Sequence, residues 1–160
     1  MYKGVRKFGV KRIEIKLKGL FNSKERNNST LVSNRIFKEI TTAYGISKGT
    51  LITTNNRGKT TEAKVMAMIL HYKHADMTQD DVAALFLRVT SLVHRRLRSF
   101  DYIITGGKQN RPRHHATYSK VFHQITFMPT YREIEKRIVI FKENLNKPPD
   151  DDKRQEEKNS

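Results

Sequence analysis

Five polar side chains share one face of a segment predicted to be helical, and their chemistry suits the recognition of DNA bases. From the second member onward they follow the i, i+3, i+4, i+7 spacing of a single helix face. The set is Thr90, Ser91, His94, Arg95 and Arg98. Hydroxyl, imidazole and guanidinium groups donate to base edges in the major groove, and arginine suits the O6 and N7 atoms of guanine. A solvated basic face on an ordinary helix is the alternative interpretation.

The elements that position these side chains have the proportions of a helix-turn-helix. An apolar stripe on the opposite face would anchor a helix over residues 90–103, through Leu92, Val93, Leu97 and Phe100. A shorter helix precedes it, where Thr78 and Asp81 have the spacing of a capping box. Val82, Leu85 and Phe86 would point inward. With a tight connection at residues 87–89, the pair predicts a recognition helix that fits the major groove.

A second set of basic side chains suits the phosphate backbone, because lysine and arginine bind it through charge whatever the base sequence. The set is Arg57, Lys59, Lys64, Arg88, Arg96, Arg111 and Arg113. Residues 111–115, followed by Tyr118, would form an arm that tracks phosphates and stacks an aromatic ring on a base. A solvated linker is the alternative for that arm.

The composition favours a polyanionic partner. The chain has 160 residues, with 32 Lys and Arg against 16 Asp and Glu, so the formal net charge is +16. The absence of Cys excludes a disulfide scaffold, thiolate zinc sites and a cysteine nucleophile. No apolar run is long enough to span a bilayer, and residues 1–20 lack the apolar core of a secretory signal. We therefore expect no membrane partner and a cytoplasmic, nucleoid-associated location.

No constellation predicts catalysis, a metal or a cofactor. His71 and His74 are three residues apart but have no third ligand at a suitable spacing, so we expect a solvent-facing or amphipathic position for both. The segment 58–60 matches the end of a phosphate-binding loop, but the glycine that should begin the motif is absent at Thr53. We expect a protein that is not an enzyme.

Apolar periodicity predicts the other elements before the helix-turn-helix. Alternating apolar and charged residues at 10–20 are typical of a short strand, and residues 22–30 form a polar loop. A helix should run from Ser33 to Gly45, followed by an irregular segment at 47–60 with Leu51 and Ile52 tucked inward. Thr61 would then cap the next helix, which ends near residue 75 and buries Val65, Met66, Ile69, Leu70 and Tyr72.

The C-terminal part should contain two more helices. After a basic linker at 106–115, a helix over 116–128 would bury Tyr118, Val121, Phe122 and Ile125 and end at Pro129. Thr130 and Glu133 would form the capping box of a last helix, with Ile134, Ile138, Phe141 and Leu145 inward.

The predicted fold class is mainly α: a helix-turn-helix bundle with a short N-terminal β element and extra C-terminal helices. We divide the chain into a basic N-terminal extension (1–32), a helix-turn-helix domain (33–104), a basic linker with C-terminal helices (105–145) and a disordered tail (146–160).

Several motifs within residues 33–104 occur together in one known family. An amphipathic helix ends in a tyrosine, Tyr44. It is followed by a leucine-isoleucine pair (Leu51-Ile52), a Met-Ala-Met triplet (residues 66–68) and a Thr-Ser-Leu-Val-His run (residues 90–94). In these features the chain resembles the C-terminal DNA-binding domain of DnaA, the bacterial replication initiator. The resemblance implies an all-helical, Trp-repressor-like helix-turn-helix that binds duplex DNA.

The chain departs from that family at two contact positions. The family has an Asp-His pair before its two hydroxyl residues, where this chain has Arg88 and Val89 before Thr90 and Ser91. Asn56 occupies the principal arginine position of the family's basic loop. The ATPase module has no counterpart here. The family's own target sequence therefore does not carry over.

The sequence predicts a non-enzymatic, double-stranded DNA-binding protein in replication or transcription control, of the kind encoded by phages or mobile elements. The alternative from another class is a structural or adaptor protein of a nucleoprotein assembly, with RNA or an acidic protein as its partner.

Overall fold

A computed structural model describes residues 23–54, 58–108 and 110–147, and over these residues the chain is mainly helical, as predicted, with no strand. In chain order the elements are α2 (Ser23–Tyr44), α3 (Lys48–Thr53), α4 (Lys59–His74), α5 (Gln79–Leu85), α6 (Thr90–Ile104), α7 (His115–Tyr118), the 3-10 helix η1 (Lys120–His123) and α8 (Phe127–Asn146). The strand expected at 10–20 and nearly all of the expected tail lie outside the described residues.

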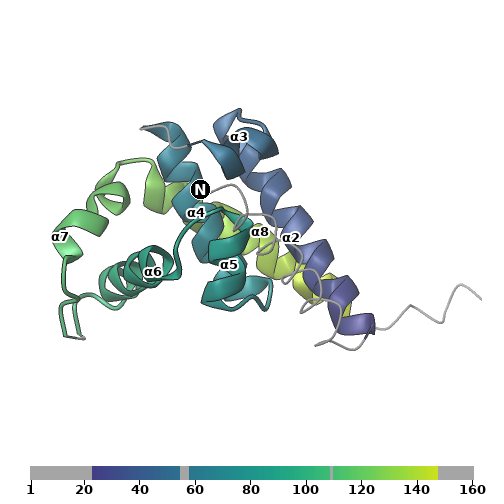
Figure 1. Ribbon diagram of the computed structural model, residues 1–160. Helices are drawn as coiled ribbons and strands as arrows, with labels where there is room; N and C mark the ends of the chain where they lie inside the picture. Colours follow the sequence, from purple (N-terminus) through teal and green to yellow (C-terminus); the bar gives the residue numbers. More distant parts are fainter. Residues whose placement is uncertain (1–22, 55–57, 109, 148–160) are drawn as a thin grey trace, which may run out of the picture.

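Helix α4 is the centre of the bundle (Figure 1). It contacts α2, α3, α5, α6, η1 and α8, and its residues 62–71 are all buried. A helix buried on every side needs apolar residues all round, and the run from Val65 to Leu70 supplies them. The predicted inward positions Val65, Met66, Ile69 and Leu70 are confirmed, whereas Tyr72 is exposed.

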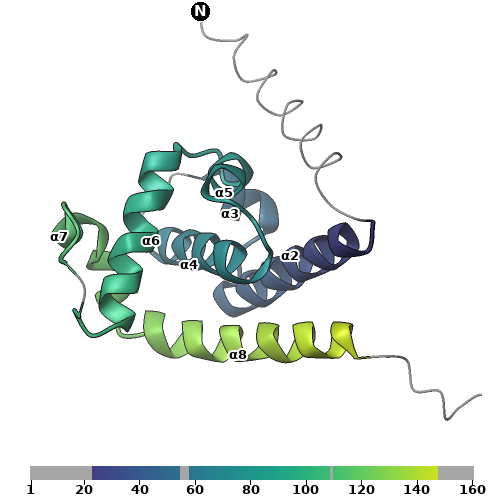
Figure 2. The ribbon, with the colours of Figure 1, turned by 90° about the horizontal axis from the view of Figure 1, so that it is seen from below.

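Helices α2 and α8 lie side by side, which Figure 2 shows from below. Glu39 of α2 is buried and accepts from Arg137 of α8 at 3.0 Å and from Arg35 at 2.6 Å. Ile134 and Ile138 of α8 are buried in the same core as Ile36 and Ile40. The C-terminal helix is therefore packed into one body with the helices of residues 33–104.

A cluster of aromatic rings ties α6 to α8. The ring of Phe100 on α6 lies 5.4 Å from that of Phe122 and 4.9 Å from that of Tyr131, centre to centre. Phe127 completes the cluster at 5.2 Å from Phe122. The predicted recognition helix is thus held on its inner face by the C-terminal elements as well as by α5.

The N-terminal boundary of the first helix was wrong in the sequence-based prediction. Helix α2 begins at Ser23, not Ser33, so the expected polar loop at 22–30 is helical from its second residue. Tertiary contacts stabilise this polar turn: the hydroxyl of Ser29 donates to the carbonyl of Ala75 at 2.6 Å, and Val32 is buried. The division expected between residues 32 and 33 falls inside this helix.

Two other local predictions between residues 47 and 61 were also wrong. Residues 48–53 form α3, which Ser47 caps by accepting from the backbone of Thr50 at 3.0 Å. Leu51 is buried as expected. Helix α4 begins at Lys59 after Gly58, so Thr61 lies inside it rather than at its cap.

The segment before α8 is less helical than predicted. The expected helix over 116–128 is replaced by the short α7 and η1; Phe122 is buried, but Ile125 is 94% exposed. Helix α8 begins at Phe127, so Pro129 lies in its first turn, where no backbone donor is needed. Thr130 is consequently inside the helix, and the predicted capping box with Glu133 does not form.

Candidate nucleic-acid interface

Helices α5 and α6 are joined by a tight turn whose geometry is fixed at both ends of α5. The expected capping box is present: the backbone of Asp81 donates to the Thr78 hydroxyl at 3.2 Å, and the backbone of Thr78 donates to the Asp81 carboxylate at 3.0 Å. At the other end, Arg88 N donates to Ala83 O at 2.8 Å around Leu87, whose φ is 52°. This bond closes the last turn of α5 and sets the direction in which α6 starts.

Helix α6 presents the predicted base-reading residues to solvent. Thr90, Ser91, His94, Arg95 and Arg98 are all exposed, whereas Val93, Leu97 and Phe100 are buried. The helix therefore has one face in the core and one face of hydrogen-bond donors, which is the division that a recognition helix needs. Whether this face reads bases stays a prediction.

Two of these residues are held by α5. The hydroxyl of Thr90 donates to the carboxylate of Asp80 at 2.6 Å, and Nδ1 of His94 lies 3.1 Å from Oε1 of Gln79. Sequence spacing identified Thr90 and His94 but not these partners, because only the crossing of α5 over the start of α6 brings them together. These contacts orient the two side chains against α5.

The basic arm lies alongside the middle of the same face, at His94, Arg95 and Arg98. The guanidinium of Arg95 donates to the Tyr118 hydroxyl at 3.1 Å and lies 5.9 Å from the centre of its ring. Arg113 lines a cavity of about 240 Å³ with His94, Arg95 and Arg98. His115 is buried beside Tyr102, with ring centres 4.7 Å apart, and anchors the arm. Arg111 is exposed in the same arm.

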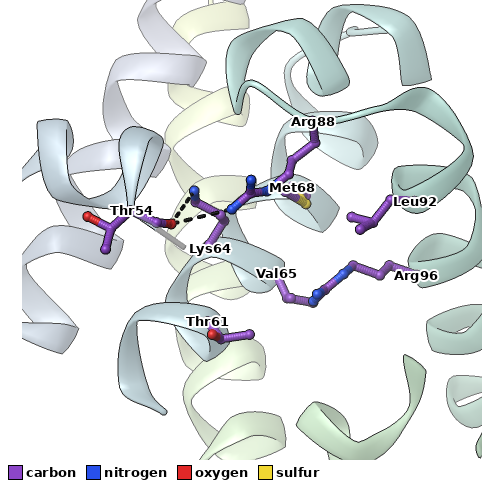
Figure 3. Close-up of a pocket in the computed structure, with 8 residues that line it drawn as sticks. All are labelled: Thr54, Thr61, Lys64, Val65, Met68, Arg88, Leu92 and Arg96. Carbon is purple, nitrogen blue, oxygen red and sulfur yellow. Dashed lines mark hydrogen bonds between the residues drawn. The ribbon is translucent and has the colours of Figure 1, made fainter. Parts of the chain in front are cut away.

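Lys64, Arg88 and Arg96 gather in a second cavity, between α4, α6 and the end of α3 (Figure 3). Lys64 is only 5% exposed, and its amine donates to the carbonyls of Ile52 and Thr54 at 2.7 and 2.8 Å. Arg88 also donates to Thr54, at 3.4 Å. The sequence identified each residue as basic, but nothing in it placed Lys64 in the interior.

Of the other two phosphate-binding candidates, the structure describes only Lys59. Lys59 is exposed as the first residue of this helix, next to the positive end of its dipole. Arg57 lies outside the described residues. The basic loop can therefore be judged only at Lys59, which is free of the core.

The histidines of α4 are structural. His71 is fully buried, so the expected solvent-facing or amphipathic position is wrong for it, whereas His74 bonds to the carboxylate of Glu135 at 3.0 Å. Within the described ranges, no group of three or more His, Asp or Glu side chains is arranged to hold a metal ion. No helix of this part of the chain is both long and apolar enough to cross a membrane.

No family model, curated protein or solved structure matches this chain. The likeness to the DNA-binding domain of the initiator thus remains an expectation from residues 33–104.

Proposed function

We propose that the protein binds double-stranded DNA through α5 and α6, with α6 in the major groove, and acts in replication or transcription control. The observation that carries the proposal is the two-sided character of α6. Its inner face is packed by Val93, Leu97 and Phe100, and its outer face exposes the five predicted donors along its length. A role in DNA control implies a location at the nucleoid.

Cations on neighbouring elements support the same interface. Arg113 approaches the outer face of α6 from the arm, and Arg88 precedes the first turn of the helix. Backbone contacts of this kind orient a protein on the duplex, and contacts from the recognition helix provide discrimination among bases. In this proposal Arg95 and Arg98 contact bases, while Lys59, Arg111 and Arg113 contact phosphates.

Competition binding tests the proposal. A labelled random duplex should bind the protein at physiological salt, and single-stranded DNA or RNA of equal length should compete less well than duplex. If about five to eight phosphates are neutralised, log K should fall against log salt with a slope of roughly −4 to −7. An affinity that hardly changes with salt would contradict the proposal that the positive charge of the protein serves to bind DNA.

Selection of bound sequences from random duplex DNA separates this function from the adaptor alternative. An enriched motif is expected if α6 reads bases. A flat result together with tighter binding to RNA or to an acidic protein would instead favour the adaptor.

A further inference from the structure

Three cationic side chains from different parts of the chain converge on one cavity. Lys64 of α4, Arg88 of the turn and Arg96 of α6 line it with Thr54 and Thr61, and its volume is about 290 Å³. Figure 3 shows both guanidinium groups extending from the α6 side toward α4. Among the described residues that line the cavity there is no carboxylate. The cavity therefore concentrates three positive charges with no counter-charge in its described wall.

The neutral wall of the cavity compensates these charges only in part. One carbonyl oxygen, that of Thr54, accepts from both Lys64 Nζ and Arg88 Nη2. The Nε atom of Arg96 is buried and has no hydrogen-bond partner in the described part of the chain. A buried donor without a partner costs free energy, and more so on a charged group. An acceptor with negative charge is what this arrangement lacks.

The charges also affect one another. Burial, followed by repulsion from Arg88 and Arg96, lowers the pKa of Lys64 from 10.5 to about 8. Burial and the charge of Arg88 lower the pKa of Arg96 as well. An anion in the cavity would favour the charged forms of both groups, since an opposite charge nearby stabilises them.

We propose that this cavity is an anion site that binds one phosphate group between Arg88, Arg96 and Lys64. Guanidinium groups suit this ligand because their planar set of N–H donors can bind two phosphate oxygens at once. The phosphate can be a backbone phosphate of bound nucleic acid or free inorganic phosphate. Only the first source rests on the proposed function.

Thermal unfolding with inorganic phosphate tests the site without DNA. At constant ionic strength, replacing chloride with phosphate should raise the unfolding midpoint of the wild type in a concentration-dependent way, because a ligand of the folded state stabilises it. Arg96→Gln should weaken the apparent phosphate affinity by roughly tenfold or more, the effect of a lost hydrogen bond to a charged group. In chloride alone this variant should be at least as stable as the wild type, because it removes repulsion.

The matched control is Arg132→Gln, which removes an exposed arginine of α8 that does not line the cavity. This variant should keep the full response to phosphate. An equal response in the wild type and both variants would mean that phosphate acts on the whole basic surface, and would overturn the site.

Duplex binding by the same variants identifies the source of the phosphate. If the site holds a backbone phosphate, Arg96→Gln should weaken all duplexes alike and reduce the salt slope by about one. If Arg96→Gln loses the response to phosphate but keeps the duplex affinity of the wild type, the site binds free phosphate. If no duplex binds at all but the phosphate response still depends on Arg96, the site stands and the proposed function fails. No response of the wild type to phosphate together with unchanged duplex affinity would overturn the inference.

Discussion

The burial of His71 predicts a specific loss of stability in mild acid. Its Nδ1 lies 2.8 Å from the carbonyl of Ala67 and therefore donates, and its Nε2 lies 3.0 Å from the hydroxyl of Ser33. The ring packs between Phe37 and Phe86, with centres 4.7 and 5.5 Å away. This environment holds the neutral imidazole, and burial lowers the pKa of His71 from 6.5 to about 4 against a smaller opposing effect of the bond to Ala67.

The sign and size of the effect follow from proton linkage. Between pH 6.5 and 4 the unfolded chain binds a proton that the folded chain does not, so the free energy of unfolding rises with pH in this window. At 1.36 kcal/mol for each pKa unit, the lowered pKa of His71 contributes about 3 kcal/mol to the free energy of unfolding at neutral pH, of which about 2 kcal/mol is lost by pH 5. Above pH 6.5 this contribution is fully present.

Urea unfolding at a series of pH values from 7.5 to 4 measures this contribution of His71 to the free energy of unfolding. The wild type should lose about 3 kcal/mol more over this range than His71→Gln, which has no titrating group at this position. The variant His123→Gln, on an exposed imidazole, controls for the loss of a histidine as such. The NMR titration of the His71 ring in the wild type provides a second measurement that needs no variant. A midpoint near 6.5, or equal acid sensitivity of wild type and His71→Gln, would refute the reasoning.

Three further outcomes are expected. Leu87→Gly should raise the free energy of unfolding by about 1 kcal/mol in urea titrations. The left-handed backbone at φ 52° costs an L-residue about 1–2 kcal/mol, which glycine would not incur, although the greater freedom of glycine in the unfolded chain offsets part of this stabilisation. A destabilised variant would show that the leucine side chain is needed there. Lys59→Ala should weaken selected and random duplexes about equally in fluorescence anisotropy and flatten the salt slope by about one; a loss confined to the selected duplex would contradict a phosphate role. Micromolar ATP or ADP should leave duplex affinity unchanged, since the chain lacks a phosphate-binding loop; nucleotide-dependent binding would contradict this.

The parts of the fold that depend on local signals were predictable. The capping box of Thr78 and Asp81 and the start of α6 at Thr90 each depend on residues that are close in sequence, and the structure has both as predicted. The same signals misled at Thr61 and Thr130, because a hydroxyl followed by an acid can also lie inside a helix once packing extends it. Helix α2 was predicted too short because its first turns are polar and depend on a bond to Ala75.

The candidate site was predictable as a set of residue types but not as an arrangement. The exposed face of α6 was predictable from periodicity, because the apolar residues mark the buried side and the opposite side must then face solvent. The burial of Lys64 depends on the carbonyls of Ile52 and Thr54 at the end of α3. It could not be predicted because α3 itself was not predicted. The approach of Tyr118 to Arg95 likewise depends on where α7 lies against α6.

The most direct test of the central claim compares Arg95→Ala with the wild type on a selected duplex and on random duplex DNA. If Arg95 reads a base, the variant should lose about 1–3 kcal/mol of binding free energy on the selected duplex and much less on random DNA. Tyr118→Phe, which removes the hydroxyl that Arg95 contacts, controls for effects transmitted through the arm. Equal weakening of both duplexes by Arg95→Ala, in a variant with an unchanged thermal transition, would contradict the assignment of α6 as the recognition helix.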